Sequence, residues 1–406
     1  MLTVRVRRNS QLQKVLSDNH PDFVVGTTSA EERVKLLIVR DLLQLGWEIS
    51  FKTDRVHITP PACYDKRVVR ASMQIKREVS LSRYGNWIKE HAHLGPENLA
   101  DGTEVWQSEI DPLIEVCKTQ EQLNIFRFFR FYWSSPYSEY VGRRIKLLVR
   151  DNALPRKPLI GIAALGSSIV HIPDRDCWVN WDTKSRTKNL VYTMDAYVLG
   201  ALPPYNHILG GKLISYLMAS TEVRKAFERK YRAMVTEISR RTANRLACIF
   251  TTSLYGKSSQ YNRVKYNGAL LYVPIGQTKG YGTLHLTDET FEAMRGLLRQ
   301  KNVLVPNRFG DGPVWRMRVI RTAADLLKFD SDFLLRHSFQ RAIYAVPLAR
   351  NTRQFLQGTN KRLRYLNYSI ADLTAHWKNR WLKPRKNNVD VKTAVINFRA
   401  EDFAIL

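Results

Sequence analysis

One apolar stretch, Leu159-Ile-Gly-Ile-Ala-Ala-Leu165, constrains the fold of this chain more than any other segment. A continuous run of this kind suits a strand that is buried on both faces in the centre of a sheet. The segment at 143–150 is predicted to be a strand as well, and the charged, Pro-containing turn at 151–158 joins the two. We therefore predict a hairpin whose second strand lies inside a larger sheet.

Strands and helices alternate through the rest of the middle region. Strand 196–202 runs through a turn into an apolar helix at 210–219, and an amphipathic helix over 220–241 leads to strand 245–251. This alternation predicts a mixed α/β (α+β) fold rather than an all-helical one. By composition the chain divides into three regions: a mainly helical, basic region at 1–120, the α/β core at 121–290 and a basic helical region at 291–406.

The charge balance of the chain is unusual for a globular protein. The chain has 64 Lys and Arg residues against 37 Asp and Glu residues, which gives a formal net charge of +27. Such an excess favours a polyanionic partner, because cations that neutralise a phosphate backbone release its counterions. We therefore expect a nucleic-acid partner, DNA in the first place. The alternative is a basic surface that serves solubility or binds an acidic protein.

The C-terminal region concentrates this charge. Asp372 is the only acidic residue between Arg336 and Lys386, and aromatic residues are interleaved with the cations. Cations contact the phosphate backbone and aromatic rings stack on bases, so the segment is typical of nucleic-acid binding. The cations that we expect to contact phosphate here are Arg362, Arg364, Arg380 and Lys383.

The segment Gly276-Gln-Thr-Lys-Gly-Tyr-Gly282 is glycine-rich, cationic and aromatic. Such a loop suits close approach to a nucleic-acid backbone, with Lys279 on a phosphate and Tyr281 stacked on a base. The alternative is a β-turn that joins strands at 272–275 and 283–286. The two interpretations are compatible.

Several separate blocks of the middle region carry a family resemblance. They are Asp174-Arg-Asp-Cys-Trp178, Met194-Asp-Ala-Tyr-Val-Leu-Gly200, Pro203-Pro-Tyr-Asn206, Leu209-Gly-Gly-Lys-Leu213 and Tyr255-Gly-Lys-Ser-Ser-Gln-Tyr-Asn-Arg263. With these blocks in order, most of the chain resembles the DruA family, a component of the Druantia anti-phage defence systems of bacteria. The resemblance implies a role in defence against invading DNA, together with other Druantia subunits such as a helicase.

The core is also similar, more distantly, to the GNAT acetyltransferase-like fold. In that fold a strand leads into a Gly-rich turn and a helix that hold the coenzyme A pyrophosphate, which here corresponds to the turn and helix at 207–219. Small residues let a backbone approach phosphate closely, whereas Lys212 stands at such a position here. We therefore expect an architectural turn with no bound cofactor, and we expect Lys212 to contact a nucleic-acid phosphate.

A dense acidic patch lies at Asp174, Asp176 and Asp182. One hypothesis makes these carboxylates the ligands of a divalent metal for phosphodiester cleavage, so that the protein is a DNA-processing enzyme. The other makes them helix caps and partners of arginines. We favour the second and expect no metal, because no His or Glu at ligand spacing accompanies them. An acyltransferase that uses the turn at 207–219 is a further alternative.

The cysteines Cys63, Cys117, Cys177 and Cys248 are scattered and form no CxxC pair. This spacing argues against structural zinc and against a disulfide framework. The N-terminus lacks the apolar run of a signal peptide, and no window approaches the length of a spanning helix. We therefore expect a cytoplasmic protein with no membrane partner.

Overall fold

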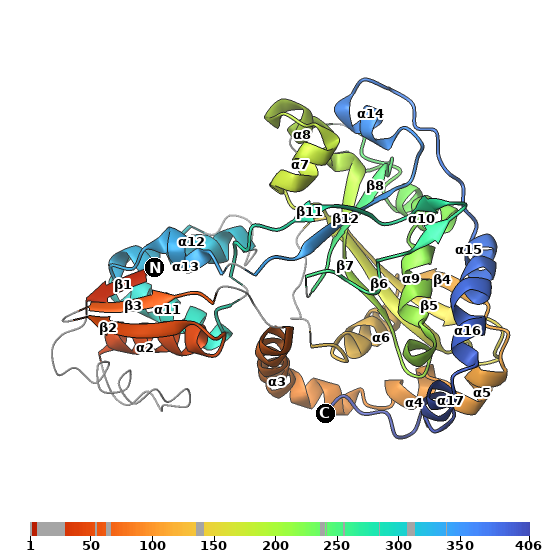
Figure 1. Ribbon diagram of the computed structural model, residues 1–406, viewed down its shortest axis with the longest axis horizontal. Helices are drawn as coiled ribbons and strands as arrows, with labels where there is room; N and C mark the ends of the chain where they lie inside the picture. Colours follow the sequence, from red (N-terminus) through yellow and green to blue (C-terminus); the bar gives the residue numbers. More distant parts are fainter. Residues whose placement is uncertain are drawn as a thin grey trace. The chain divides into compact units, whose positions relative to one another are not determined.

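A computed structural model gives the arrangement of the helices and strands (Figure 1). The structure describes residues 2–5, 29–52, 55–61, 66–134, 142–235, 240, 242–254, 256–283, 285–306, 313–337 and 339–406. Cys63 and Tyr255 lie outside the described residues. The chain forms two compact units, each assembled from separate segments. Unit 1 comprises residues 1–79, 134–136 and 278–340, and unit 2 comprises residues 80–133, 137–277 and 341–406.

Unit 1 combines a small antiparallel sheet with helices. The strand order is β1-β3-β2. The strands are β1 (Leu2–Arg5), β2 (Glu48–Lys52) and β3 (Arg55–Thr59), and the helices are α2 (Ala30–Leu43), α11 (Asp288–Gln300), α12 (Pro313–Leu326) and α13 (Ser331–Leu335). The core lies between α2, α11 and α12, with Leu42, Met294 and Ile320 fully buried. The division between the units falls within α3 (Lys66–Glu90).

Unit 2 is built on a seven-stranded sheet in the order β11-β12-β8-β7-β6-β5-β4. Only β7 and β8 pair in parallel, and the other neighbours are antiparallel. The strands are β4 (Pro112–Val116), β5 (Arg144–Asp151), β6 (Leu159–Ser167), β7 (Thr193–Ala201), β8 (Cys248–Thr252), β11 (Val273–Gln277) and β12 (Ala342–Pro347). A small hairpin, β9 (Lys265–Tyr266) with β10 (Ala269–Leu270), lies outside this sheet.

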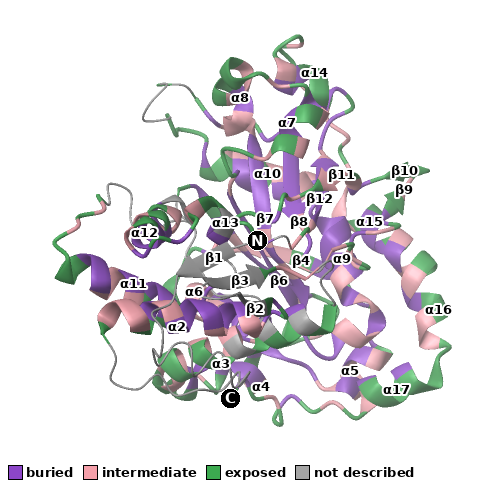
Figure 2. Ribbon diagram, turned by 60° about the vertical axis from the view of Figure 1, so that its left-hand side comes forward, coloured by how far each residue is buried: buried purple, intermediate pink, exposed green. Residues whose placement is uncertain are grey.

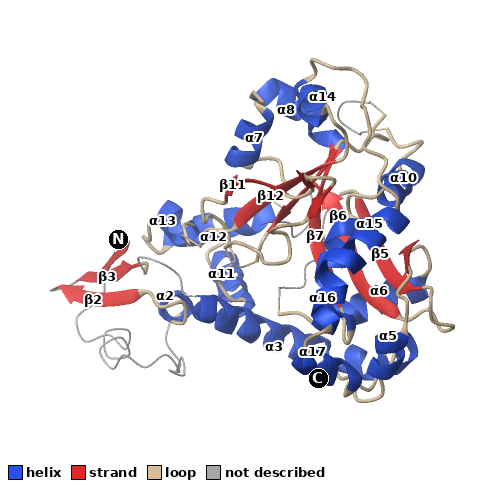
Figure 3. Cartoon of the chain, turned by 45° about the vertical axis from the view of Figure 1, so that its right-hand side comes forward, coloured by secondary structure: helices blue, strands red, loops and turns tan. Residues whose placement is uncertain are grey.

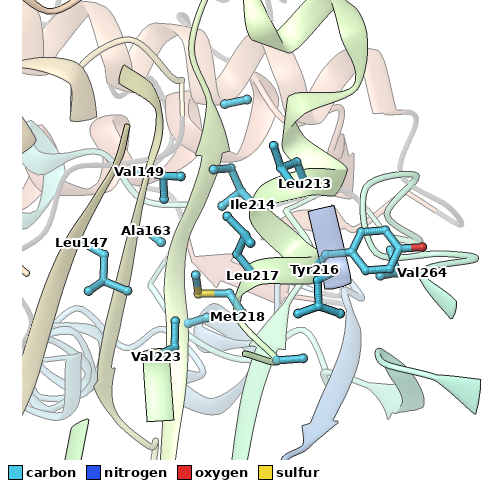
Figure 4. Close-up of a cluster of buried hydrophobic side chains, with 14 of the residues drawn as sticks. Leu147, Val149, Ala163, Leu213, Ile214, Tyr216, Leu217, Met218, Val223 and Val264 are labelled. Atoms are coloured by element: carbon cyan, nitrogen blue, oxygen red, sulfur yellow. The ribbon is translucent and has the colours of Figure 1, made fainter. Parts of the chain in front are cut away.

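Helices cover both faces of the large sheet, so unit 2 has three layers. Neighbouring residues of β5 point to opposite faces: Leu147 packs in a cluster with α9 (Gly210–Leu217), and Leu148 packs in a cluster with α6 (Gln120–Arg130). Figure 4 shows Leu213, Ile214 and Leu217 of α9 near Leu147 and Ala163 of the sheet. In Figure 2 the central strands are accordingly coloured as buried.

The remaining helices of unit 2 lie around this core. They are α4 (Leu94–Asn98), α5 (Gly102–Gln107), α7 (Pro173–Val179), α8 (Thr183–Asn189), α10 (Thr221–Lys230), α14 (Thr352–Gln357), α15 (Ile370–Trp377), α16 (Lys383–Lys386) and α17 (Val389–Ile396). A π-helical turn, η3 (Lys378–Leu382), joins α15 to α16. Figure 3 shows α15, α16 and α17 following one another along one side of unit 2.

The predicted α/β fold and its central hairpin are confirmed, because β5 and β6 pair antiparallel inside the large sheet. Two local predictions are wrong. The helix expected over 220–241 ends at Lys230, where Tyr231 turns to donate a hydrogen bond to the Arg144 carbonyl. The strand before the glycine-rich loop, β11, pairs with β12 rather than with 283–286. Among the described helices, none has the length and apolarity needed to cross a bilayer.

Candidate functional site

The three aspartates of the acidic segment have separate partners. Asp174 accepts a hydrogen bond from the Gln277 backbone N–H at 2.8 Å, which fastens α7 to the end of β11. Asp182 is the N-cap of α8 and accepts from the Ser185 N–H at 2.6 Å. That hydrogen bond holds the pKa of the exposed Asp182 carboxyl below its usual range. Both carboxylates therefore act in the local structure as cap or tether.

Asp176 belongs to a buried ionic network. Its Oδ1 accepts from Nε and Nη2 of Arg175 at 2.9 and 2.6 Å, and its Oδ2 accepts from Arg186 at 2.9 Å. Arg175 is completely buried, and its Nη1 and Nη2 also donate hydrogen bonds to the carbonyls of Ile169 and Val170. Two guanidinium groups thus neutralise Asp176.

Within the described ranges, no group of three or more His, Cys, Asp or Glu side chains is placed to hold a metal ion. The arrangement of the acidic segment supports its role as caps and ion-pair partners. The nuclease hypothesis for these aspartates stays a prediction that an activity assay has to test.

Lys212 lies in the first turn of α9 and is 8% exposed. Its ammonium donates to the carbonyls of Ser259 and Asn262 at 2.8 and 2.9 Å, and it lies 4.3 Å from the centre of the Trp381 ring. Burial, together with the nearby charges of Arg263 and Arg380, lowers its pKa to about 8. The position that the sequence assigns to a phosphate contact thus holds a lysine bound to the protein's own backbone.

The same segment covers the N-terminal turn of α9. Strands β7 and β8 pair only as far as Ala196 and Thr251, although β7 continues to Ala201. Past that point, Gln260 donates to the Leu199 carbonyl and to the Ser215 hydroxyl, each at 3.2 Å. A Cβ on Gly211 would lie 3.4 Å from the Gln260 side chain. The Gln260 side chain therefore lies against Gly211 and Ser215 of α9 and bonds this helix to β7.

The four C-terminal cations are exposed on unit 2, in two groups. Arg362 and Arg364 belong to the segment after α14, which is anchored by Asn351 through the Arg362 carbonyl and the Arg364 N–H. Arg380 lies on η3 above the Trp381 ring at 5.2 Å, and Lys383 begins α16. Among the residues that the structure describes, none of the four is paired with a carboxylate.

Lys279 and Tyr281 belong to unit 1, whereas the other candidate residues belong to unit 2. The Tyr281 hydroxyl donates to Asp332 at 3.3 Å and accepts from Arg321, whose guanidinium carbon lies 5.9 Å from the centre of the ring. Tyr281 is 38% exposed. The ring therefore keeps an accessible area for stacking while its hydroxyl is held in place.

Sequence reasoning missed Asp195, a buried carboxyl on the central strand β7. Its Oδ2 accepts from the Ile169 N–H at 2.9 Å, and burial raises its pKa to about 6. The available signal was a charged residue inside an otherwise apolar strand, because such a residue is buried only for a structural or chemical reason.

Comparison with known proteins decides the family of this chain. A family model described as Druantia protein DruA matches residues 64–358, which run from before α3 to the end of α14. The chain is also 35% identical over 371 residues to the Druantia protein DruA of Escherichia coli (strain UMEA 4076-1), covering 90% of each chain. The chain belongs to the DruA family.

The DruA family match includes the acidic segment, Asp195 and Lys212, whereas Arg362, Arg364, Arg380 and Lys383 lie beyond residue 358. No solved structure matches the chain. The resemblance of the DruA core to the GNAT fold therefore stays a prediction.

Proposed function

We propose that this DruA-family protein binds nucleic acid, DNA in the first place, through exposed cations of unit 2. In this proposal it serves anti-phage defence together with other Druantia subunits, including a helicase. The observation that carries the proposal is the unpaired state of Arg362, Arg364, Arg380 and Lys383 within the described structure. Exposed cations without carboxylate partners keep their full attraction for phosphate.

Family membership supports the defence role, since the matched Escherichia coli relative is named a Druantia protein. The net charge of +27 supports a polyanionic partner over an acidic protein, because backbone phosphates offer one charge at every nucleotide. Binding would rest mainly on phosphate contacts, with ring stacking at Tyr281 in unit 1 as a separate contribution.

The test is electrophoretic binding of the full chain to single-stranded, duplex and forked DNA, each over a salt series and with or without magnesium. Retention of at least one of these DNAs that weakens steeply with salt supports the proposal. No retention at low salt would contradict it. Supercoiled plasmid in the same buffers separates binding from cleavage, and metal-dependent nicking would favour the enzyme hypothesis at Asp174, Asp176 and Asp182.

A further inference from the structure

A short loop after β6 presents two large aliphatic side chains to solvent. Ile169 is 54% exposed and Val170 is 66% exposed. Single exposed apolar residues are ordinary on a protein surface, whereas contiguous exposed apolar surface marks a candidate binding site. The hydrogen bonds of the loop backbone determine whether these two side chains are fixed in place.

The backbone of the loop is fastened by buried charged groups. Asp195 accepts the Ile169 N–H at 2.9 Å, and Arg175 donates to the carbonyls of both Ile169 and Val170. Asp195 is 8% exposed and Arg175 is completely buried. Burying such groups is costly, and here their hydrogen bonds go to the backbone of the exposed pair. The pair is thus pre-organised rather than loose.

A second exposed aliphatic pair lies at the same end of the sheet. Met234 and Val235, which follow α10, are 37% and 49% exposed. The Met234 carbonyl accepts a hydrogen bond from the Ala243 N–H at 3.3 Å. The buried Arg143 ties this segment to the start of β7 by donating to the carbonyls of Ala243 and Thr193 at 3.5 and 3.3 Å. The Thr193 hydroxyl in turn lies 2.8 Å from the Ser168 hydroxyl, next to Ile169.

Cations precede the second pair in the chain. Arg229, Lys230 and Arg232 are all exposed and lie within a few residues of Met234 along the chain. Burial lowers the pKa of Lys230, and the nearby charges of Arg144 and Lys146 lower it further. Aliphatic side chains bordered by cations fit a base stack flanked by phosphates better than they fit an apolar protein groove.

We propose that Ile169, Val170, Met234 and Val235 form an aliphatic wedge that inserts between bases of a nucleic-acid duplex. This inference rests on the proposed nucleic-acid binding. It specifies in addition how the bound duplex is deformed. Insertion unstacks a base step and is favoured where the step is already weakened, as at a mismatch. The neighbouring cations hold the backbone on either side of the opened step.

The test uses the full chain and duplexes that carry 2-aminopurine, whose fluorescence rises when it is unstacked. One duplex is perfect and the other has a mismatch beside the probe. We expect the wild type to raise the fluorescence and to prefer the mismatched duplex by about tenfold, because a mismatched step costs less to unstack and about 1.4 kcal/mol is tenfold in affinity. The double variants I169S/V170S and M234S/V235S should lose both effects and keep the salt dependence of binding, because no cation is removed. Val389→Ser, at a 74% exposed residue of α17, is the control and should behave as the wild type.

The failures of the two proposals are distinguishable. If the wild type binds no DNA at low salt, the proposed function is wrong and the wedge falls with it. If the wild type binds with steep salt dependence but shows no unstacking, or if the double variants match the wild type, the wedge alone is overturned. Double variants that bind and unstack DNA normally but no longer co-purify with other Druantia subunits would make the surface a protein interface, and this also overturns the wedge.

Discussion

The guanidinium of Arg175 clasps the carboxylate of Asp176, its neighbour in the chain, with Nη2 and Nε at 2.6 and 2.9 Å from Oδ1. Both residues lie on α7, yet the remaining donors of Arg175 serve the loop before that helix. Asp176, which belongs to the acidic patch of the sequence, therefore forms an ion pair with the arginine that anchors this loop.

The first prediction contrasts Asp176 with Asp182. Asp176→Asn removes the charge that compensates the buried Arg175, and we expect it to lower the free energy of unfolding by about 3 kcal/mol. Asp182→Asn keeps an acceptor oxygen for the Ser185 N–H at an exposed cap, and should change stability little. Urea unfolding of the two variants and the wild type measures the difference. Equal stability of both variants would contradict the anchoring role of Asp176.

The second prediction concerns the C-terminal cations. Replacing Arg362, Arg364, Arg380 and Lys383 by Ala should weaken DNA binding and reduce the slope of log affinity against log salt. Each lost phosphate contact lowers that slope by about 0.9, so four lost contacts lower it by about 3 to 4. The measurement is a salt series of binding curves.

The matched control removes the same amount of charge from exposed positions of unit 1, by replacing Arg33, Arg299, Arg318 and Lys328 with Ala. This control should leave the slope nearly unchanged. An equal fall in slope for both variants would mean that overall charge, and not the C-terminal surface, attracts the DNA.

The third prediction follows from Asp195. Its folded pKa of about 6 lies above the ordinary value of an aspartate, because burial disfavours the charged form. A raised pKa stabilises the fold below the unfolded pKa, and this contribution is lost as the pH rises from about 4 through 6. The Asp195→Asn variant has no titrating carboxyl at this position and so does not lose this stabilisation. Its free energy of unfolding relative to that of the wild type should therefore rise over that pH range, by at most about 3 kcal/mol. Urea unfolding at pH 4.5 and pH 8 tests this, with the exposed Asp402→Asn as control.

The fourth prediction is that acetyl-CoA does not bind. The segment at 258–262 covers the N-terminal turn of α9, where Gln260 bonds to β7 and Lys212 to neighbouring carbonyls. Calorimetry at sub-millimolar acetyl-CoA should give no heat of binding. A clear one-to-one isotherm would instead favour the acyltransferase alternative.

The sequence predicted the elements of the core better than their partners. The apolar run at 159–165 identified the strand because burial on both faces leaves no polar alternation. The pairing of β11 with β12 was out of reach, since the segment of unit 1 at 278–340 separates these strands. This inserted segment also makes both compact units discontinuous in the chain. A change in composition along the sequence can mark only the limits of contiguous regions. The three-region division at 120 and 290 remains a statement about composition.

The candidate site shows the same limit. Asp182 was predictable as a cap, because an N-cap is set by residues within one helical turn. The tie between Asp195 and Ile169 spans 26 residues, and it exists only because β6 and β7 pair. Nothing in the local sequence indicates where such a carboxyl will point. Lys212 stands out in the sequence because small residues are expected at its position, but its carbonyl partners lie near residue 260 and no spacing rule connects them.

The last prediction decides what Lys212 does. If its ammonium serves only the carbonyls of Ser259 and Asn262, Lys212→Met should lower the free energy of unfolding by about 2 kcal/mol, because the carbonyls lose a charged donor. The salt slope of DNA binding should then stay as in the wild type. If Lys212 also contacts a phosphate, the slope should fall by about 0.9 in the same variant. Binding curves over a salt series, taken at a temperature where urea unfolding shows the variant to be folded, separate the two roles. A lowered slope with unchanged stability would make Lys212 a nucleic-acid contact, as the sequence first suggested.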